Sequence, residues 1–181
     1  MANKYTQKTQ EALQQAQMRA SAAGNPEMRP AHVLEALLKQ EDGIAAPVLK
    51  ATGVDPDTVA REASELISTY PSAQGQNMAN PGINRDLQTA LQHAQDLAGE
   101  LGDEFVSADV LLASIAKGGD DAAELLTKRG ATFEALKEAF SSVRGGKKVT
   151  TENPEDQFQA LQKYSTDLTA RAREGKIDPV I

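Results

Sequence analysis

Apolar and small residues recur along the chain at the three- and four-residue spacing of α-helices. The first stripe comprises Thr9, Ala12, Leu13, Ala16, Ala20 and Ala23. Gly24 follows it and can adopt the left-handed backbone that ends many helices. A second stripe, Val33, Leu34, Leu37 and Leu38, begins after Pro30, a residue favoured in the first helical turn. No segment alternates apolar and polar residues over enough positions for a strand. The pattern therefore predicts an all-α protein.

Two further helices complete this first unit. A short one with Val48 and Leu49 ends at Gly53. Asp55 can then cap a fourth helix that Pro56 starts, and its apolar stripe is Val59, Ala63, Leu66 and Ile67. The unit is thus expected to hold four helices within residues 5–70.

The four-helix unit occurs twice. Residues 9–24, TQEALQQAQMRASAAG, align without gaps on residues 87–102, LQTALQHAQDLAGELG, and residues 28–63 align on residues 105–140 after a gap at Pro26. Identical positions include Ala12, Leu13, Ala16, Ala20 and Gly24 in the first segment and Ala31, Val33, Leu34, Ala36, Ala45, Ala46, Leu49 and Gly53 in the second. In the second copy Ser107 stands near the start of the second helix as an expected N-cap, and Thr132 opens the fourth helix. The chain is therefore a tandem duplication of about eight helices.

Two polar breaks set the expected domain boundaries. Residues 71–84, PSAQGQNMANPGIN, indicate an exposed loop between the copies, and residues 145–157, GGKKVTTENPEDQ, indicate a flexible linker. Helical spacing resumes at Phe158, Leu161, Tyr164 and Leu168. We therefore expect a domain over residues 1–144, with repeat one at about 5–70 and repeat two at about 83–144, then the linker and a C-terminal linker helix within residues 158–181.

Composition excludes several classes of protein. The net charge is −7, and no run of basic residues marks a phosphate-binding stripe, so nucleic acid is not an expected partner. No apolar stretch approaches the roughly 20 residues that span a bilayer, and the N-terminus lacks the apolar core of a signal peptide. The chain has no cysteine, which excludes disulfides and fits a reducing compartment. We expect a cytoplasmic protein without membrane contact.

The C-terminal segment KYSTDLTARAREGKIDPVI, residues 163–181, closely resembles the sequence that opens the first AAA+ ATPase domain in ClpB-type disaggregases of the Clp/HSP100 family. Residues 26–54, PEMRPAHVLEALLKQEDGIAAPVLKATGV, are similar to the first repeat of these proteins, and residues 143–150, VRGGKKVT, to their linker. The resemblance implies a Clp N-terminal domain with pseudo-twofold symmetry, followed by an ATPase domain that is truncated before its phosphate loop.

The same resemblance implies a function. Such a domain recognises exposed apolar segments of stress-damaged polypeptide clients and passes them to the pore of a homohexamer, which uses ATP and Mg²⁺ and works with a DnaK-type chaperone. The fragment itself is expected to be a monomer without a cofactor. ClpC-type unfoldases, which deliver substrates or adaptors to a ClpP protease, are the alternative. Their second helices usually open with Gly-Thr-Glu-His, whereas this chain has Arg29-Pro30-Ala31-His32 and Val106-Ser107-Ala108-Asp109.

The sequence offers no catalytic constellation. A phosphate loop needs its first glycine where Ser141 stands and a Ser or Thr where Lys148 stands, so Gly146-Lys147 does not form one. His32 and His93 are the two histidines, and neither has a metal-ligand pattern around it. We expect His32 on the surface of the second helix and His93 beside the interface between the repeats. The fragment is therefore not expected to be an enzyme.

Positions at which the two copies differ suggest where the domain is used. Leu97 replaces Arg19, Leu112 replaces Glu35 and Asp109 replaces His32. The extra leucines either pack the repeats together or line a peptide groove, and a purely structural helical spacer is a further possibility. By resemblance, the client-contacting surface comprises Thr6, Leu91, Leu97, Asp103, Asp109 and Val110. An apolar groove with this acidic rim would favour clients with basic flanks, bound at micromolar strength or worse.

Overall fold

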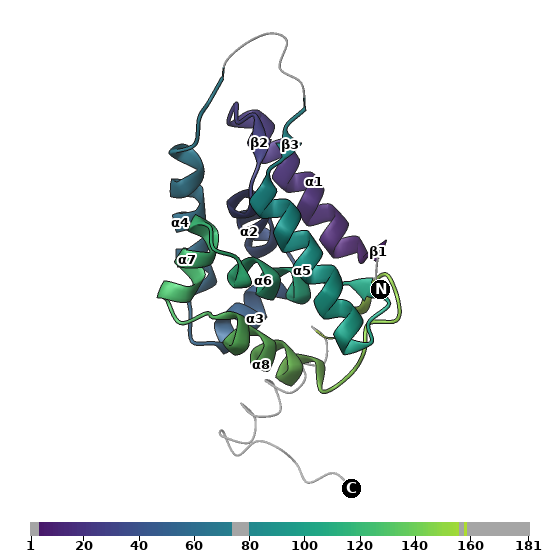
Figure 1. Ribbon diagram of the computed structural model, residues 1–181. Helices are drawn as coiled ribbons and strands as arrows, with labels where there is room; N and C mark the ends of the chain where they lie inside the picture. The colour runs from purple at the N-terminus through teal and green to yellow at the C-terminus, as the bar shows by residue number, and fades with distance from the viewer. Residues whose placement is uncertain (1–3, 74–79, 156–157, 159–181) are drawn as a thin grey trace, which may run out of the picture.

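The computed structural model describes residues 4–73, 80–155 and 158. Within these residues two units of four helices follow one another (Figure 1). The first unit holds α1 Gln7–Ala22, α2 Pro30–Lys39, α3 Ala45–Ala51 and α4 Pro56–Ser68. The second holds α5 Arg85–Leu101, α6 Ala108–Lys117, α7 Asp121–Lys128 and α8 Phe133–Arg144. The predicted duplicated all-α fold is confirmed. Apart from Phe158, the predicted C-terminal helix lies outside the described residues.

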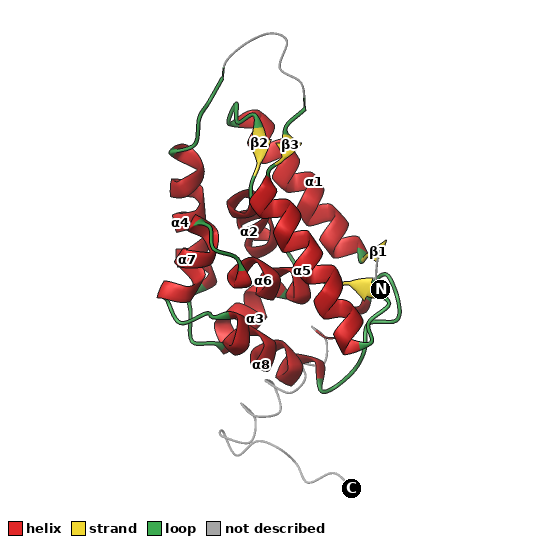
Figure 2. Cartoon of the chain, viewed as in Figure 1, coloured by secondary structure: helices red, strands yellow, loops and turns green. Residues whose placement is uncertain are grey.

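The expectation that no strand forms is wrong in one respect, since in the described part of the chain four two-residue strands join the units (Figure 2). β1 Lys4–Tyr5 pairs in parallel with β4 Phe105–Val106, and β2 Glu27–Met28 pairs in parallel with β3 Gly82–Ile83. A two-residue strand is too short to show alternation, so sequence periodicity does not detect it. β1 corresponds to β3 in the repeat, and β2 to β4, so the two pairings are related by the pseudo-twofold symmetry.

The strand pairs fix how α1 and α5 lie together. β1 precedes α1 while its partner β4 follows α5, and β2 follows α1 while its partner β3 precedes α5. The two helices therefore run antiparallel, with each end tied by one strand pair (Figure 1). Their core positions are small: Ala12, Ala16, Ala90 and Ala94 are all buried. Small side chains let α1 approach α2 closely and let α5 approach α6 in the same way, which explains why the repeat preserves these alanines.

Most predicted helix ends are confirmed. Asp55 accepts a hydrogen bond from the Asp57 amide at the start of α4, and Thr132 accepts one from the Ala135 amide at the start of α8. Gly24 follows α1 with a φ of +74°, in the left-handed region that the sequence indicated for it. Ser107 is the exception. It occupies the N-cap position of α6, but its side chain makes no capping hydrogen bond there.

The core is shared between the repeats. α2 and α6 are buried along nearly their whole length and contact each other, while α4 contacts α7 and α3 contacts α8. Helices from both copies thus close over a single core, which holds Leu34, Leu37, Leu111, Leu112 and Phe140 among its largest members. Because the two copies pack into one core, residues of the first repeat are held against residues of the second. The candidate site contains residues from both repeats.

Candidate functional site

Four of the six residues predicted for client contact lie together at one end of the molecule. Thr6 caps α1, Asp103 lies between α5 and β4, and Asp109 and Val110 belong to the first turn of α6. The β1–β4 pairing brings them together, because the Thr6 amide donates to the Val106 carbonyl at 3.0 Å. Leu91 and Leu97 lie along α5. Both pack against the core, Leu91 as a partly buried residue.

These residues were expected to form an exposed groove and its rim, but the structure buries most of them. Thr6, Asp103, Asp109 and Val110 are all buried, and Leu97 is only 3% exposed. The burial of Leu97 fits the packing alternative. Its role in client contact, like that of the other five residues, stays a prediction. The acidic rim is not found in the described structure, since both aspartates point into an internal ion-pair network.

Arg144, the last residue of α8, holds that network together. Its Nε donates to Asp109 Oδ2 at 2.8 Å, and its Nη1 donates to Asp103 Oδ2 at 2.9 Å. Nη2 donates to the Ser107 hydroxyl at 2.7 Å, and that hydroxyl in turn donates to Asp109. This explains why Ser107 does not cap α6. Burial opposes the charge of Arg144, but Asp109 and Asp103 outweigh it and raise the pKa of the guanidinium.

The segment that follows α8 folds back over the cluster. We call its described part, residues 147–155 with Phe158, the return segment. The Val149 amide donates to Asp103 Oδ1 at 2.9 Å, and the Val149 carbonyl accepts from the Glu104 amide at 2.8 Å. Farther along, the Glu152 carbonyl accepts from the Gln7 amide at 2.8 Å. The linker was predicted to be flexible. In the structure its described residues lie against both repeats, and its mobility stays a prediction.

Glu155 reaches into the centre of the site. Its Oε1 accepts from the Thr6 hydroxyl at 2.6 Å and from the Ala108 amide at 3.2 Å, so it takes the capping role that Ser107 leaves open. The positive end of the α6 dipole favours an anion at this point. Its Oε2 has no hydrogen-bond partner among the described residues. Burial and, to a smaller extent, the nearby Asp109 charge raise the pKa of Glu155 to about 7.

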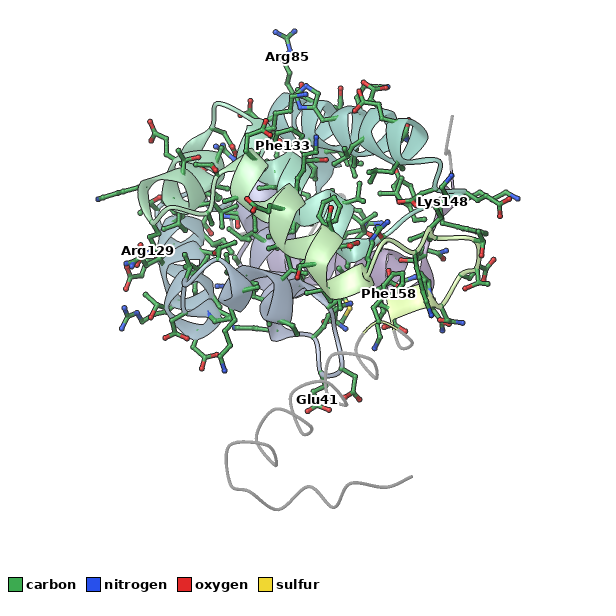
Figure 3. The ribbon with its side chains drawn as sticks, turned by 90° about the horizontal axis from the view of Figure 1, so that it is seen from below. Glu41, Arg85, Arg129, Phe133, Lys148 and Phe158 are labelled. Carbon is green, nitrogen blue, oxygen red and sulfur yellow. The ribbon has the colours of Figure 1, made fainter. Side chains whose placement is uncertain are left out.

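Apolar contacts anchor the two ends of the return segment. Val149 is fully buried, and Phe158 is 1% exposed. The Arg144 guanidinium lies 5.5 Å from the centre of the Phe158 ring, within the range of a cation–π contact. Phe158 and Lys148 lie on the same side of the molecule in Figure 3, with Arg129 on the opposite side. The return segment is therefore held by backbone hydrogen bonds, one carboxylate and buried apolar side chains.

The first repeat has an uncharged network at the corresponding place. His32 stands at the position that corresponds to Asp109. It was expected on the surface of its helix, but it is fully buried. Its Nδ1 accepts from the Arg29 amide at 2.9 Å and its Nε2 lies 2.9 Å from Asn25 Oδ1. Burial, followed by the positive charge of Arg19, lowers the pKa of His32 to about 4. The ring is therefore neutral at pH 7 and has a structural role.

A groove of 580 Å³ lies between α1 and α2 of the first repeat, beside the positions that correspond to the extra leucines of the second repeat. Arg19 Nε donates to Glu35 Oε1 there at 2.9 Å, and the side chain of Met18 lines the same groove. Leu97 and Leu112 occupy the positions of that ion pair in the second repeat and are buried. The difference between the copies is thus a charged pair beside a groove in one and an apolar pair in the core of the other.

Sequence reasoning did not identify three residues of this site: Arg144, Ser107 as a network member, and Glu155. Arg144 had a usable signal, because it stands where the first repeat has the buried Ile67 and a charge at a core position needs a partner. Glu155 had none. No group of metal-ligating residues and no helix able to cross a membrane occurs among the residues that the structure describes.

Comparison with known proteins identifies the class. The sequence model of the family described as "Clp repeat (R) N-terminal domain" matches residues 4–129. The chain belongs to this family, as its paired four-helix units indicate.

Individual relatives narrow the comparison. The chain is 70% identical over 176 residues to a protein of Corynebacterium diphtheriae named chaperone protein ClpB, a match that covers 97% of this chain and 21% of the relative. The chain thus spans about a fifth of the length of that relative. The N-terminal domain of Hsp104 from Candida albicans has the same fold, with a TM-score of 0.72 at 14% identity over 84% of this chain and 99% of the other. A complex of the ClpV N-domain with a VipB peptide has a TM-score of 0.61 at 24% identity, over 76% and 85% of the two chains.

Proposed function

We propose that this domain recognises client polypeptides for an ATP-dependent chaperone that disaggregates and unfolds stress-damaged proteins. It binds exposed apolar segments of these clients and passes them to the pore of a hexamer. The close ClpB relatives support the chaperone assignment. We further propose, from the resemblance to ClpB-type proteins, that the full-length protein is cytoplasmic, uses ATP and Mg²⁺ and works with a DnaK-type chaperone. For this fragment we propose a monomer without a cofactor.

One observation carries the recognition role: the predicted client surface accommodates a stretch of polypeptide, the chain's own return segment. The Glu104 amide and the Gln7 amide donate to its backbone carbonyls. Two apolar side chains of the segment, Val149 and Phe158, are buried against the domain. Backbone hydrogen bonds give affinity without demanding a sequence, and side-chain pockets add selectivity. A surface of this kind suits clients that share little beyond exposed apolar residues.

The expected charge preference changes with the site. Basic flanks were predicted from an exposed acidic rim, but Asp103 and Asp109 are buried and paired with Arg144. The side chain that enters the site is instead an acid, Glu155, received by a hydroxyl and a helix N-terminus. We therefore propose a preference for apolar segments that carry a hydrogen-bond acceptor, in place of segments with basic flanks.

The solved neighbours support a peptide-binding role at the level of fold. A ClpV N-domain of the same fold forms a complex with a VipB peptide. Two other assignments compete with our proposal. A ClpC-type unfoldase would use the domain to recruit substrates or adaptors for a ClpP protease, and a spacer would bind nothing. The ClpB relatives disfavour the first, and the occupied surface disfavours the second.

The test is an affinity measurement with a matched client pair. Reduced, carboxymethylated α-lactalbumin is permanently unfolded, while the native form of the same protein hides its apolar segments. Each is labelled with fluorescein and titrated with the full 181-residue chain while anisotropy is recorded. We expect saturable binding of the unfolded form at micromolar strength or weaker, because ordering a disordered client offsets much of the contact energy. Absence of binding, or equal binding of the native form, would contradict the proposal.

A further inference from the structure

We propose that the return segment is an intramolecular ligand of the client surface, so that a client segment binds where the return segment has left it. This inference rests on the proposed function and adds a competitor to it. Four observations on the described residues carry it: the segment's backbone hydrogen bonds, its carboxylate at the start of α6, its buried aromatic ring and its overlap with the predicted contact residues.

The overlap is direct. The Thr6 hydroxyl donates a hydrogen bond to Glu155, and Asp103 accepts one from the Val149 amide. The Ala108 amide, one residue before Asp109, donates to Glu155. A client that used Thr6, Asp103 or the start of α6 would need the same donors and acceptors, so the two occupants exclude each other.

Part of the segment is a shared feature of the repeat, and part is not. In the first copy the Asn25 side chain donates to the Pro71 carbonyl at 3.0 Å, and the Ala73 amide donates to the Gly24 carbonyl at 2.8 Å. Val149 and its neighbours repeat this turn-back. The contacts at Glu152, Glu155 and Phe158 go beyond this turn-back. These later contacts are the ones we assign to a ligand.

The fit of the later contacts is imperfect, as expected for an occupant that leaves. Glu155 Oε2 is buried and has no hydrogen-bond partner within the described part of the chain, which is an unfavourable feature that undocking removes. Glu152 is exposed and contributes only its carbonyl. A client offering an acceptor side chain followed by an aromatic residue, in the pattern of Glu155 and Phe158, would reproduce the contacts of the segment.

Competition has a calculable effect. If the segment is docked about 90% of the time, the apparent client affinity is about tenfold weaker than that of the open surface. Removing the segment should therefore strengthen client binding by up to about tenfold. Fixing the segment in place should weaken binding by a similar factor or more.

The chain offers a direct way to fix it, because it has no native cysteine. Gln7 and Glu152 are both exposed, and the backbone hydrogen bond of 2.8 Å between them places their Cα atoms within roughly 6 Å, the range of disulfides. The variant Gln7→Cys/Glu152→Cys is made in the full chain. Its binding to carboxymethylated α-lactalbumin is compared before and after reduction, with the two single-cysteine variants as controls. We expect oxidation to weaken binding at least tenfold and reduction to restore it.

A second variant keeps the test decisive if the disulfide does not form. Glu155→Ala/Phe158→Ala removes both later anchors and should bind the client more tightly than the parent chain, by up to about tenfold. Glu152→Ala, which keeps the backbone carbonyl, is the matched control and should bind like the parent. Equal binding by the oxidised, reduced and released proteins would overturn the competition while leaving client recognition intact. No binding by any of them, the released variant included, would instead overturn the proposed function.

Discussion

Replacing Leu97 by arginine tests how the second repeat uses its extra leucines. Leu97 is 3% exposed on α5, and its counterpart in the first repeat is Arg19, which pairs with Glu35 beside an open groove. The second repeat provides Leu112 at the position of Glu35, so an arginine at 97 lacks the carboxylate that Arg19 has. Leu97→Arg therefore places an unpaired charge in an apolar core.

The expected cost follows from two contributions. Loss of a buried leucine side chain costs about 2–3 kcal/mol, and burying an unpaired charge adds several more unless the arginine reaches water. We expect a total of roughly 3–5 kcal/mol, a large share of the 5–15 kcal/mol that stabilises an ordinary domain. A domain of this size should melt roughly 10–15 °C lower.

Circular dichroism at 222 nm followed on heating measures this, since the fold is helical. Met18→Arg is the matched control because Met18 is 64% exposed on α1, and it should melt close to the parent protein. The double variant Leu97→Arg/Leu112→Glu recreates the ion pair of the first repeat and should recover part of the loss. A Leu97→Arg protein that melts within about 2 °C of the parent would refute the packing assignment for Leu97.

Three further predictions follow from the site and the sequence. Thr6→Val and Thr132→Val each remove one helix N-cap, which contributes about 1 kcal/mol to stability. In urea unfolding Thr6→Val should cost more than Thr132→Val, because it also loses the hydrogen bond to Glu155. Equal losses of unfolding free energy would contradict that hydrogen bond. The pKa of Glu155 is raised from 4.5 to about 7 in the docked state, so docking of the return segment should be most stable below pH 4.5. As the pH rises through 7, the docking free energy should fall by up to about 3 kcal/mol. Hydrogen exchange of the Gln7 amide, which donates to the segment, would report this loss. Glu155→Gln should remove that dependence, and a dependence that persists would assign it to another group. The chain should not bind ATP, because it lacks a phosphate loop, and saturable micromolar binding by calorimetry would contradict this.

Local signals in the sequence were sufficient for the helical framework. Spacing, proline and capping residues each depend on a few neighbouring positions, and the duplication supplied a second copy of every signal. Asp55, Thr132 and Gly24 therefore act in the structure as their local sequence indicates. The grouping of Thr6, Asp103 and Asp109 in one surface was implied by the resemblance to ClpB-type proteins and did not follow from these local signals.

Long-range burial could not be predicted in the same way. Whether Asp109 faces water or Arg144 depends on a contact across 35 positions, and the contact from Thr6 to Glu155 crosses 149. His32 shows the same limit, since a polar residue on an otherwise apolar helix can be either exposed or satisfied internally. The docking of the return segment had no sequence signal, because its polar composition is equally typical of a free linker.

Divergence between the copies has a physical explanation in the two networks. The first repeat satisfies the start of α2 with neutral groups from Asn25 and His32. The second repeat has Asp103 and Asp109 at the corresponding place, and both form ion pairs with Arg144. Arg144 stands at the position of Ile67 in the first repeat. That arginine also contacts Phe158, so the charged network of the second repeat contributes to holding the return segment. The charged network and the later contacts of the return segment thus occur in the second copy, while the first copy has a neutral network at the corresponding place.

The central claim is that the surface formed by Thr6, Asp103 and the start of α6 binds client polypeptide. Backbone amide NMR of the full chain, titrated with carboxymethylated α-lactalbumin, tests it most directly because it reports binding and location together. We predict shifts that saturate at Gln7, Glu104, Ala108 and the return segment, with α7 unaffected. Shifts confined to the groove between α1 and α2, or none at concentrations that saturate anisotropy, would contradict the account.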